Sequence, residues 1–289
     1  VNVNLLSGYL HVDYSLSIIQ FMAGVRIDYH KSLEENIRQS FGTMVSMQCG
    51  VLVTIFKEYL KIRGQVSHSH NVPSLLDTSW PGYENLNLKN VKFWTFEVSA
   101  ETKISKIFKA KFTSYFYRYN DMKVLVFSSY ESKGKERSYG IECEVSVMPL
   151  ALLKLPFNIR IFCNLWYQKT EDYLTAKIVS TYKPKIIINS GIEFILKMGL
   201  TLGIYTQYRK NYQNPDSNLP YADYYMKYFL LDIKANYRLK TRLIDIRVFL
   251  SLQNALNTNY AISGNHTVYG HYTYTMPGRT LMGGCEIKF

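Results

Sequence analysis

The chain has 289 residues, enough for one large domain or two small ones, and carries a formal net charge of +12. Aromatic residues make up 15% of it, led by 25 tyrosines, a composition that suits surfaces lying between apolar and wet surroundings. The basic residues are scattered rather than gathered in blocks, and no run of about 18 apolar residues occurs, which argues against a nucleic-acid partner and against a transmembrane helix.

Apolar and polar residues alternate along almost the whole chain, and this period of two predicts β-strands with two different faces. About thirteen such stretches occur, each near the roughly ten residues that a membrane-spanning strand needs. No amphipathic helical pattern interrupts them. In chain order the predicted strands cover residues 9–14, 23–29, 45–53, 60–66, 94–101, 108–116, 141–147, 158–165, 186–194, 202–209, 231–239, 244–253 and 280–289.

The connections between the predicted strands alternate between short and long. Short connections fall near residues 15–18, 56–58, 103–106, 148–156, 196–199 and 240–243. Long connections fall near residues 31–42, 69–89, 120–137, 169–182, 210–227 and 257–277. Short turns at one end and long loops at the other are typical of outer-membrane barrels, with periplasmic turns and extracellular loops.

The polar positions of the strands carry charges, such as Asp232 with Lys234 and Asp245 with Arg247. A polar lumen accommodates such residues, whereas the core of a soluble β-sandwich does not. The last strand ends on Phe289 with no polar tail, which suits a strand whose apolar parity touches lipid. The predicted fold is therefore an all-β, antiparallel, transmembrane outer-membrane β-barrel.

All four cysteines, Cys49, Cys143, Cys163 and Cys285, lie on the apolar parity of their strands, where they act as small lipid-facing hydrophobes. Cys143 and Cys163 fall on consecutive strands, so a disulfide between diagonal neighbours is allowed, although their spacing alone does not select one. The cysteines do not have the spacing of metal ligands.

Several motifs resemble a known family when taken in order. Leu252–Asn257 with Tyr260, then Tyr274–Arg279, then a final strand ending in Phe289 resemble the C-terminal end of TonB-dependent receptors. Upstream stretches at residues 9–11, 23–28, 67–75 and 86–97 resemble the family's mid-barrel segments, so the resemblance covers essentially the whole chain. Two departures are Ile287, where the family more often has tyrosine, and Ala255, where it has a larger residue.

The resemblance implies a 22-stranded barrel plugged by an N-terminal domain, of which residues 1–289 would be about the last thirteen strands. We expect the sequence to begin part-way through a longer protein, because alternation already runs at Tyr9 and no signal peptide precedes it. The plug and the first strands would then precede Val1. A thirteen-stranded piece would have two open edges in lipid, so the partner of the last strand is expected outside this chain.

The resemblance also implies location in a Gram-negative-type outer membrane and four kinds of partner. These are outer-membrane lipid, a TonB-type energy-coupling protein acting through the missing plug, the barrel-assembly machinery and a small solute. The assembly machinery would read the terminal aromatic, Phe289, on the closing strand. Pro277 and Gly278 would begin that strand, and the Arg279 guanidinium would hold loop carbonyls or lipid phosphates at the rim.

Residues of the expected outer loops and rim are the candidates for ligand binding, because tyrosine rings stack on incoming solutes. For His266 and His271, in the last long loop, the alternative is that they are ordinary loop residues. An aromatic girdle with ordinary loop packing is the alternative role for the tyrosines. Basic residues in these regions would attract an anionic chelate or neutralise surface glycolipid, namely Lys123, Lys133, Lys135, Arg137, Arg209 and Lys210. The candidate ligand-binding residues are Tyr205, Arg209, Tyr212, Tyr221, Tyr224, Tyr225, His266 and His271.

Motifs for catalysis or cofactor binding were not found, and no enzyme activity, cofactor or metal site is expected. Glu142 and Glu144 on one strand face are interpreted as part of a solvated ion network, and His68 with His70 lacks a third metal ligand. The leading hypothesis is an energy-coupled receptor that imports a scarce large solute, such as a siderophore-type metal chelate or a vitamin. The alternatives are a passive porin or hydrophobic-solute channel, and a barrel that serves as an enzyme or adhesin.

Overall fold

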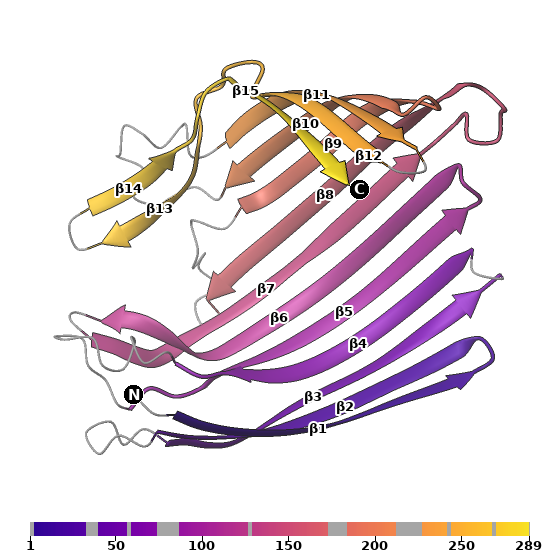
Figure 1. Ribbon diagram of the computed structural model, residues 1–289. Helices are drawn as coiled ribbons and strands as arrows, with labels where there is room; N and C mark the ends of the chain where they lie inside the picture. Colours follow the sequence, from indigo (N-terminus) through magenta and orange to yellow (C-terminus); the bar gives the residue numbers. More distant parts are fainter. Residues whose placement is uncertain are drawn as a thin grey trace. The chain divides into compact units, whose positions relative to one another are not determined.

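A computed structural model describes residues 3–32, 40–56, 59–73, 87–126, 129–172, 184–211, 227–241, 244–267 and 270–288 (Figure 1). These residues form β-strands joined by turns, and they include no helix that could cross a membrane. The strands are β1 (Val3–Leu16), β2 (Ile19–Ser32), β3 (Ser40–Ile55), β4 (Leu60–Asn71), β5 (Val91–Ile104), β6 (Phe108–Val126), β7 (Ser129–Val147), β8 (Phe157–Asp172), β9 (Pro184–Leu196), β10 (Leu200–Asn211), β11 (Lys227–Lys240), β12 (Asp245–Gln253), β13 (Ala261–Thr267), β14 (Gly270–Thr275) and β15 (Thr280–Lys288).

Thirteen of these strands form one sheet in the order β1 to β12 followed by β15, which confirms the predicted all-β fold and all thirteen predicted strands. Each strand pairs with the next one in the chain, except that β12 pairs with β15. The intervening β13 and β14 form a separate antiparallel hairpin, which the sequence analysis had placed in a loop. Within the described residues β1 and β15 each have a single neighbouring strand, so they are the edges of the sheet.

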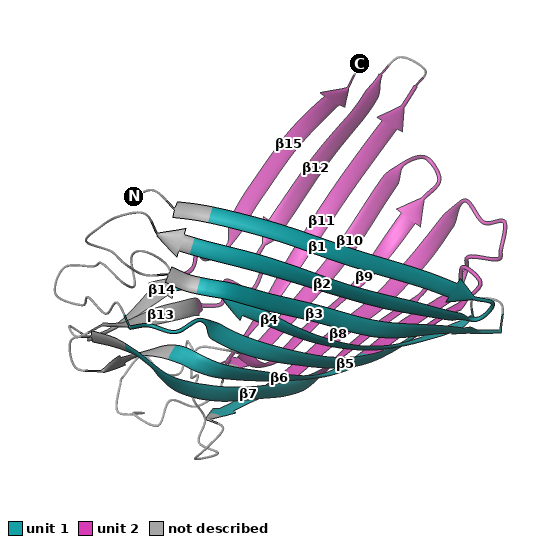
Figure 2. Cartoon of the chain, turned by 90° about the horizontal axis from the view of Figure 1, so that it is seen from below, with its two compact units in different colours: residues 1–100, 113–140, 169–179 teal, residues 101–112, 141–168, 180–289 magenta. Residues whose placement is uncertain are grey.

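The chain divides into two compact units, coloured separately in Figure 2. Unit 1 comprises residues 1–100, 113–140 and 169–179, and unit 2 comprises residues 101–112, 141–168 and 180–289. In each unit we call the end of the strands with short turns the turn end, and the opposite end the loop end.

In unit 1 the strand register sorts side chains onto two faces. Leu10 pairs with Val25, which pairs with Met47, whereas Arg26 on the other parity pairs with Ser46. Since successive side chains of a strand point to opposite sides, one face is built from aliphatic residues and the other from polar ones. We call them the apolar face and the polar face.

Unit 2 has the same two faces. Ile192 pairs with Ile204 on the apolar face, while Glu193, Gly203 and Lys234 form a row on the polar face. Apolar-face side chains remain uncovered: Leu10 in unit 1 and Ile192 in unit 2 are 69% and 54% exposed. In each unit, an uncovered apolar surface of this kind marks contact with lipid or another protein.

The turn between β9 and β10 depends on Gly199, which has a φ of 96° that other residues rarely adopt. The Gly199 N–H donates to the Leu196 carbonyl oxygen at 3.0 Å, and its own carbonyl oxygen accepts from the Arg238 N–H at 3.0 Å. A Cβ atom at this position would lie 2.1 Å from the Arg238 carbonyl oxygen. The turn therefore approaches β11 too closely for any side chain.

The structure corrects one predicted connection. Residues 120–137 were expected to form a long loop, but β6 continues to Val126 and β7 begins at Ser129. The charged residues in this stretch suggested a loop, yet the alternation of exposed Lys135 with buried Glu136 keeps the period of two. All four cysteines are free, so Cys143 and Cys163 form no disulfide.

Candidate functional site

The polar face of unit 2 carries a buried carboxylate with several partners, which we call the Glu193 cluster (Arg160, Phe162, Glu193, Tyr205 and Lys234). Glu193 is 8% exposed and accepts hydrogen bonds from Arg160 Nη2 at 2.6 Å and from the Tyr205 hydroxyl at 2.9 Å. Lys234 Nζ lies 5.0 Å from the centre of the Tyr205 ring, and Arg160 Cζ lies 5.2 Å from that of Phe162. Aromatic faces attract cations at these distances.

Two glycines make room for the rings of this cluster. A Cβ atom at Gly191 would lie 2.7 Å from the Phe162 ring, and one at Gly203 would lie 2.6 Å from the Tyr205 ring. The Phe162 and Tyr205 side chains therefore lie flat across glycine backbone instead of standing away from the sheet. Glycine inside a strand often marks such a close approach.

A hollow of about 230 Å³ lies beside the Glu193 cluster in unit 2. Its lining includes Lys109, Lys111 and Arg160 together with Glu101 and Glu144. Three cations against two carboxylates leave it slightly basic. Such a surface suits polar or anionic groups better than apolar ones.

Tyrosines of β6 mark the polar face of unit 1. The Tyr117 hydroxyl donates to Glu97 at 3.0 Å, and Gln65 Nε2 donates to the other oxygen of the same carboxylate at 2.7 Å. Tyr115, which is buried, stacks on Tyr117 with ring centres 4.7 Å apart. These residues were not among the predicted site residues, although Tyr115, Tyr117 and Tyr119 share one parity of a strand.

Unit 1 has a hollow of its own, of about 420 Å³. Polar-face residues Tyr9, His11, Arg26, Gln48 and Phe93 are among those that line it. Aromatic rings, an imidazole and a guanidinium together can stack on a planar solute and donate hydrogen bonds to it.

The loop ends of β12 and β15 are joined by an asparagine that we call the Asn254 clamp. Asn254 is 4% exposed and has a φ of 48°. Its Nδ2 donates to the carbonyl oxygens of Thr258 at 2.9 Å and Pro277 at 3.4 Å, and its Oδ1 accepts from the Thr258 N–H at 2.8 Å. The Asn254 N–H donates to Asp232 Oδ1 at 2.9 Å. One side chain thus ties both ends of residues 255–277 to the sheet.

Three of the four predicted assembly residues, Pro277, Gly278 and Arg279, lie next to this clamp. Arg279 Nε donates to the Ala255 carbonyl oxygen and the Arg279 N–H to Asn257 Oδ1, both at 2.9 Å. A Cβ atom at Gly278 would lie 2.6 Å from the same Asn257 Oδ1. Pro277 precedes β15, and Phe289 falls outside the described residues.

The predicted ligand-binding residues lie in three places. Tyr205 and Arg209 belong to the polar parity of β10, with Tyr205 inside the Glu193 cluster. His266 and His271 are register partners in the β13–β14 hairpin. The remaining four lie outside the described residues, namely Tyr212, Tyr221, Tyr224 and Tyr225.

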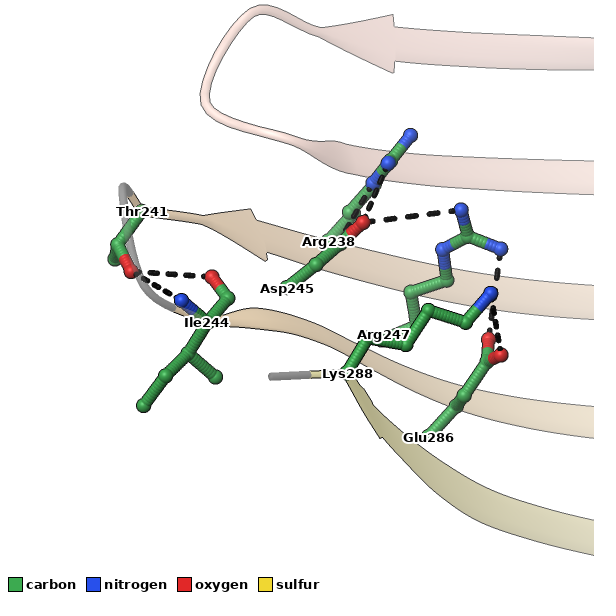
Figure 3. A network of polar contacts seen from close by, with 7 residues as sticks. All are labelled: Arg238, Thr241, Ile244, Asp245, Arg247, Glu286 and Lys288. Carbon is green, nitrogen blue, oxygen red and sulfur yellow. Dashed lines mark hydrogen bonds and ion pairs between the residues drawn. The ribbon is translucent and has the colours of Figure 1, made fainter.

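A ladder of charges crosses the turn end of unit 2 on the polar face, from β11 to β15 (Figure 3). Arg238 Nε and Nη2 donate to the two oxygens of Asp245 at 2.9 and 2.5 Å. Arg247 Nη1 lies 3.4 Å from Glu286 Oε2, and Lys288 Nζ lies 3.0 Å from Glu286 Oε1. Exposed pairs of this kind contribute little to stability, and their main effect is to favour this register.

Among the described residues no three metal-ligating side chains come together. His68 and His70 instead pack edge to face with ring centres 4.6 Å apart, and His68 also contacts the Trp94 ring. Glu144 and Lys111 both line the basic hollow, and the ion network expected around Glu142 and Glu144 stays a prediction.

Replacing Tyr205 by phenylalanine should lower the free energy of unfolding by about 1 kcal/mol, because a hydrogen bond to the Glu193 carboxylate is lost. Guanidinium unfolding of the full-length protein in lipid vesicles measures this change. The matched control is Tyr208→Phe on the apolar face of the same strand, expected within about 0.5 kcal/mol of the unsubstituted protein. Equal effects of both substitutions would contradict the assigned role of Tyr205.

Comparison with known proteins adds a family and a set of similar structures. A family model described as TonB dependent receptor-like, beta-barrel, matches residues 2–255. No curated protein matches the chain in sequence. The chain is similar in structure to the ferric-catecholate import receptor Fiu from E. coli, with a TM-score of 0.72, 14% identity, and coverage of 98% of this chain and 44% of that one.

Two further structures give similar values. The ferric citrate transporter FecA has a TM-score of 0.77 and 14% identity, with 99% of this chain and 45% of that one covered. A mutant of the ferric enterobactin receptor from Pseudomonas aeruginosa has a TM-score of 0.76 and 15% identity, with 98% and 44% covered. The chain therefore spans less than half the length of each of these proteins.

Proposed function

We propose, on the premise that this chain belongs to the TonB-dependent receptor-like β-barrel family, that its full-length protein is an outer-membrane receptor for the energy-coupled import of a scarce large solute. The family and its structural neighbours are receptors and transporters rather than enzymes. The family match over residues 2–255, on a sheet with an uncovered apolar face and a structured polar face, is the observation that carries this proposal.

The apolar and polar faces of the sheet support this proposal, because a barrel wall has one side that faces lipid and one that faces the lumen. Apolar side chains such as Leu10 and Ile192, which no protein group covers, would pack against lipid tails. The Glu193 cluster and the tyrosines of β6 would face a water-filled lumen, where hydrogen-bonded charges are tolerated. Residues 1–289 would then be the C-terminal part of the barrel, and strands and a plug encoded upstream would complete it.

The solute is proposed to be a metal chelate of the siderophore type or a vitamin. Three similar structures are named as receptors or transporters for ferric-catecholate, ferric citrate and ferric enterobactin. In this chain the hollow lined by Tyr9, Arg26 and Phe93 combines aromatic and cationic groups that suit a planar, anionic solute. The candidates for the first contact with the solute remain Tyr205, Arg209, Tyr212, Tyr221, Tyr224, Tyr225, His266 and His271.

Energy coupling is proposed to act through the plug and a TonB-type protein, and the barrel-assembly machinery to recognise the closing strand that ends in Phe289. Import then depends on different affinities for the solute in two states of the plug. A passive porin or hydrophobic-solute channel would need no such coupling.

Uptake of a radiolabelled ferric chelate by cells that carry the full-length protein tests this proposal. Collapsing the proton gradient should abolish uptake while leaving binding to the cell surface unchanged. Uptake at an undiminished rate without the gradient would identify a passive channel, and chemical alteration of the released chelate would identify an enzyme.

A further inference from the structure

We propose that the loop end of β7 and β8 binds the phosphate groups of lipid headgroups at the outer surface of the membrane, an inference that rests on the proposed membrane location. The surface consists of four cations and two carboxylates of unit 1, which we call the outer basic patch. Its members are Glu131, Lys133, Lys135, Arg137, Lys169 and Glu171.

The parity of β7 places these cations on the apolar face. From the turn end its odd-numbered residues run Val147, Val145, Cys143, Ile141 and Tyr139, and then continue as the three cations. Aliphatic residues thus give way to a tyrosine and then to basic residues along one side of one strand. Tyrosines form girdles at the level of lipid headgroups, so the cations that follow Tyr139 would lie at or just beyond that level.

Distances along the strand agree with this placement. Residues two apart on a strand are separated by about 6.6 Å, so Arg137 would lie about 7 Å and Lys135 about 13 Å beyond Tyr139 along the strand. Lys169 of β8 approaches the same tyrosine, with its Nζ 5.9 Å from the ring centre. Both strands therefore present cations next to the girdle position.

Glu171 holds two of the cations in place. It is 4% exposed, and its Oε2 accepts from Arg137 Nε at 3.1 Å and Nη2 at 2.9 Å, while its Oε1 pairs with Lys169. Both oxygens of this carboxylate are therefore engaged by cations of the patch. A guanidinium has five N–H donors, and three of those of Arg137 remain beyond this pairing.

The opposite side of the same strands is already filled. Glu136 and Ser138, the polar-face neighbours of Arg137, are 3% and 1% exposed, and Ser138 Oγ lies 3.0 Å from Thr170 Oγ1. The cations of the patch therefore do not line the polar face along which a solute would pass. The sequence left open whether Lys133, Lys135 and Arg137 attract a chelate or a glycolipid, and this placement favours the glycolipid.

Charge complementarity identifies the partner. Glu131 pairs with Lys133, and Glu171 pairs with Arg137 and Lys169. Four cations against these two carboxylates leave an excess of two positive charges, and Lys133 and Lys135 are exposed. Phosphates attached to lipid are the anions available at the depth of an aromatic girdle, and both arginine and lysine bind them. A phosphorylated glycolipid of the outer leaflet fits the patch.

The test measures binding of diphosphorylated lipid A to the full-length protein in phosphatidylcholine nanodiscs by native mass spectrometry. The variant K133Q/K135Q removes the two exposed cations and leaves the pairing of Arg137, Lys169 and Glu171 intact. Losing either lysine should weaken the affinity for the lipid roughly fivefold, so the double variant should bind roughly 25-fold more weakly. The matched control is K103Q/K106Q, which removes two exposed lysines near the β5–β6 turn and should bind as the unsubstituted protein does.

Three results would overturn the inference. They are an unchanged affinity in K133Q/K135Q, equal loss in the control, and equal binding of lipid A stripped of its phosphates. Inorganic phosphate should not displace the lipid, and if it did so at an equal concentration of phosphate groups, the patch would be a free-phosphate site. If chelate uptake by the unsubstituted protein fails while binding still depends on Lys133 and Lys135, the transport proposal falls and this one stands.

Discussion

Replacing Gly199 by alanine should sharply lower the yield of folded protein. A non-glycine residue at a φ of 96° is strained by about 1–3 kcal/mol, and the added Cβ atom would lie 2.1 Å from the Arg238 carbonyl oxygen. The turn must then move away from β11, which breaks the bond from the Arg238 N–H to the Gly199 carbonyl oxygen. We expect a total cost above about 3 kcal/mol, measured as loss of the heat-modifiable band of the full-length protein in isolated outer membranes.

Gly64→Ala is the matched control for this experiment. Gly64 lies within β4, and a Cβ atom there would have no heavy atom within 4 Å. Alanine at this position should leave the yield unchanged or slightly higher, since glycine weakens a strand interior. Similar yields for Gly199→Ala and Gly64→Ala would mean that the β9–β10 turn tolerates a side chain and that its proximity to β11 is not needed.

Replacing Asn254 by alanine should release residues 255–277 from the sheet. Three hydrogen bonds of its buried side chain are lost, which leaves the Thr258 N–H and the Thr258 carbonyl oxygen without this partner. These bonds are part-buried, so losing each of them costs about 1 kcal/mol, and alanine tolerates the φ of 48° less well than asparagine. We expect amide exchange in residues 255–279 to accelerate by more than about tenfold, while exchange in β3 stays unchanged.

A second substitution separates the two causes. Asn254→Gly removes the same hydrogen bonds but accepts the left-handed backbone. The difference between the glycine and alanine variants therefore reports the backbone strain, offset by the larger entropy that glycine has in the released segment. If the glycine variant exchanges as slowly as the unsubstituted protein, the side-chain bonds do not hold the segment. Solute binding by both variants would show whether an anchored last loop is needed for recognition.

Much of the fold could be predicted from alternation alone, because the period of two survives wherever one face must be apolar. For β11, residues 231–239 were predicted and Lys227–Lys240 were found, and the parity of Ile233 and Lys234 was correct. The stretch around Lys133 and Lys135 was predicted to be a loop because the aliphatic residues on the same side of this strand begin only at Ile141. Where neither face of a strand contacts an apolar surface, backbone hydrogen bonds and ion pairs hold the strand. Its sequence then shows no alternation of apolar and polar residues from which the strand could be predicted.

The contacts of the candidate site could not be predicted from the sequence as well as the strands could. Tyr205 was predicted from its residue type, but its partner Glu193 lies on another strand, and Arg160, which also bonds to Glu193, lies on a third. Only the register brings the three together. That register depends on turns such as Leu196–Gly199, where one residue more or less would move every side chain to the opposite face. The space that Gly191 and Gly203 leave for rings is likewise visible only after strands are paired.

The order of the sheet has a consequence for how fast it forms. Strands that follow one another in the chain find each other at small entropic cost, whereas β12 and β15 are separated by residues 254–279. Closing a loop of that length costs about 3 kcal/mol in its length-dependent part. The β13–β14 hairpin and the contacts of Asn254 shorten the effective loop, so they should speed the docking of β15 more than they stabilise the finished sheet.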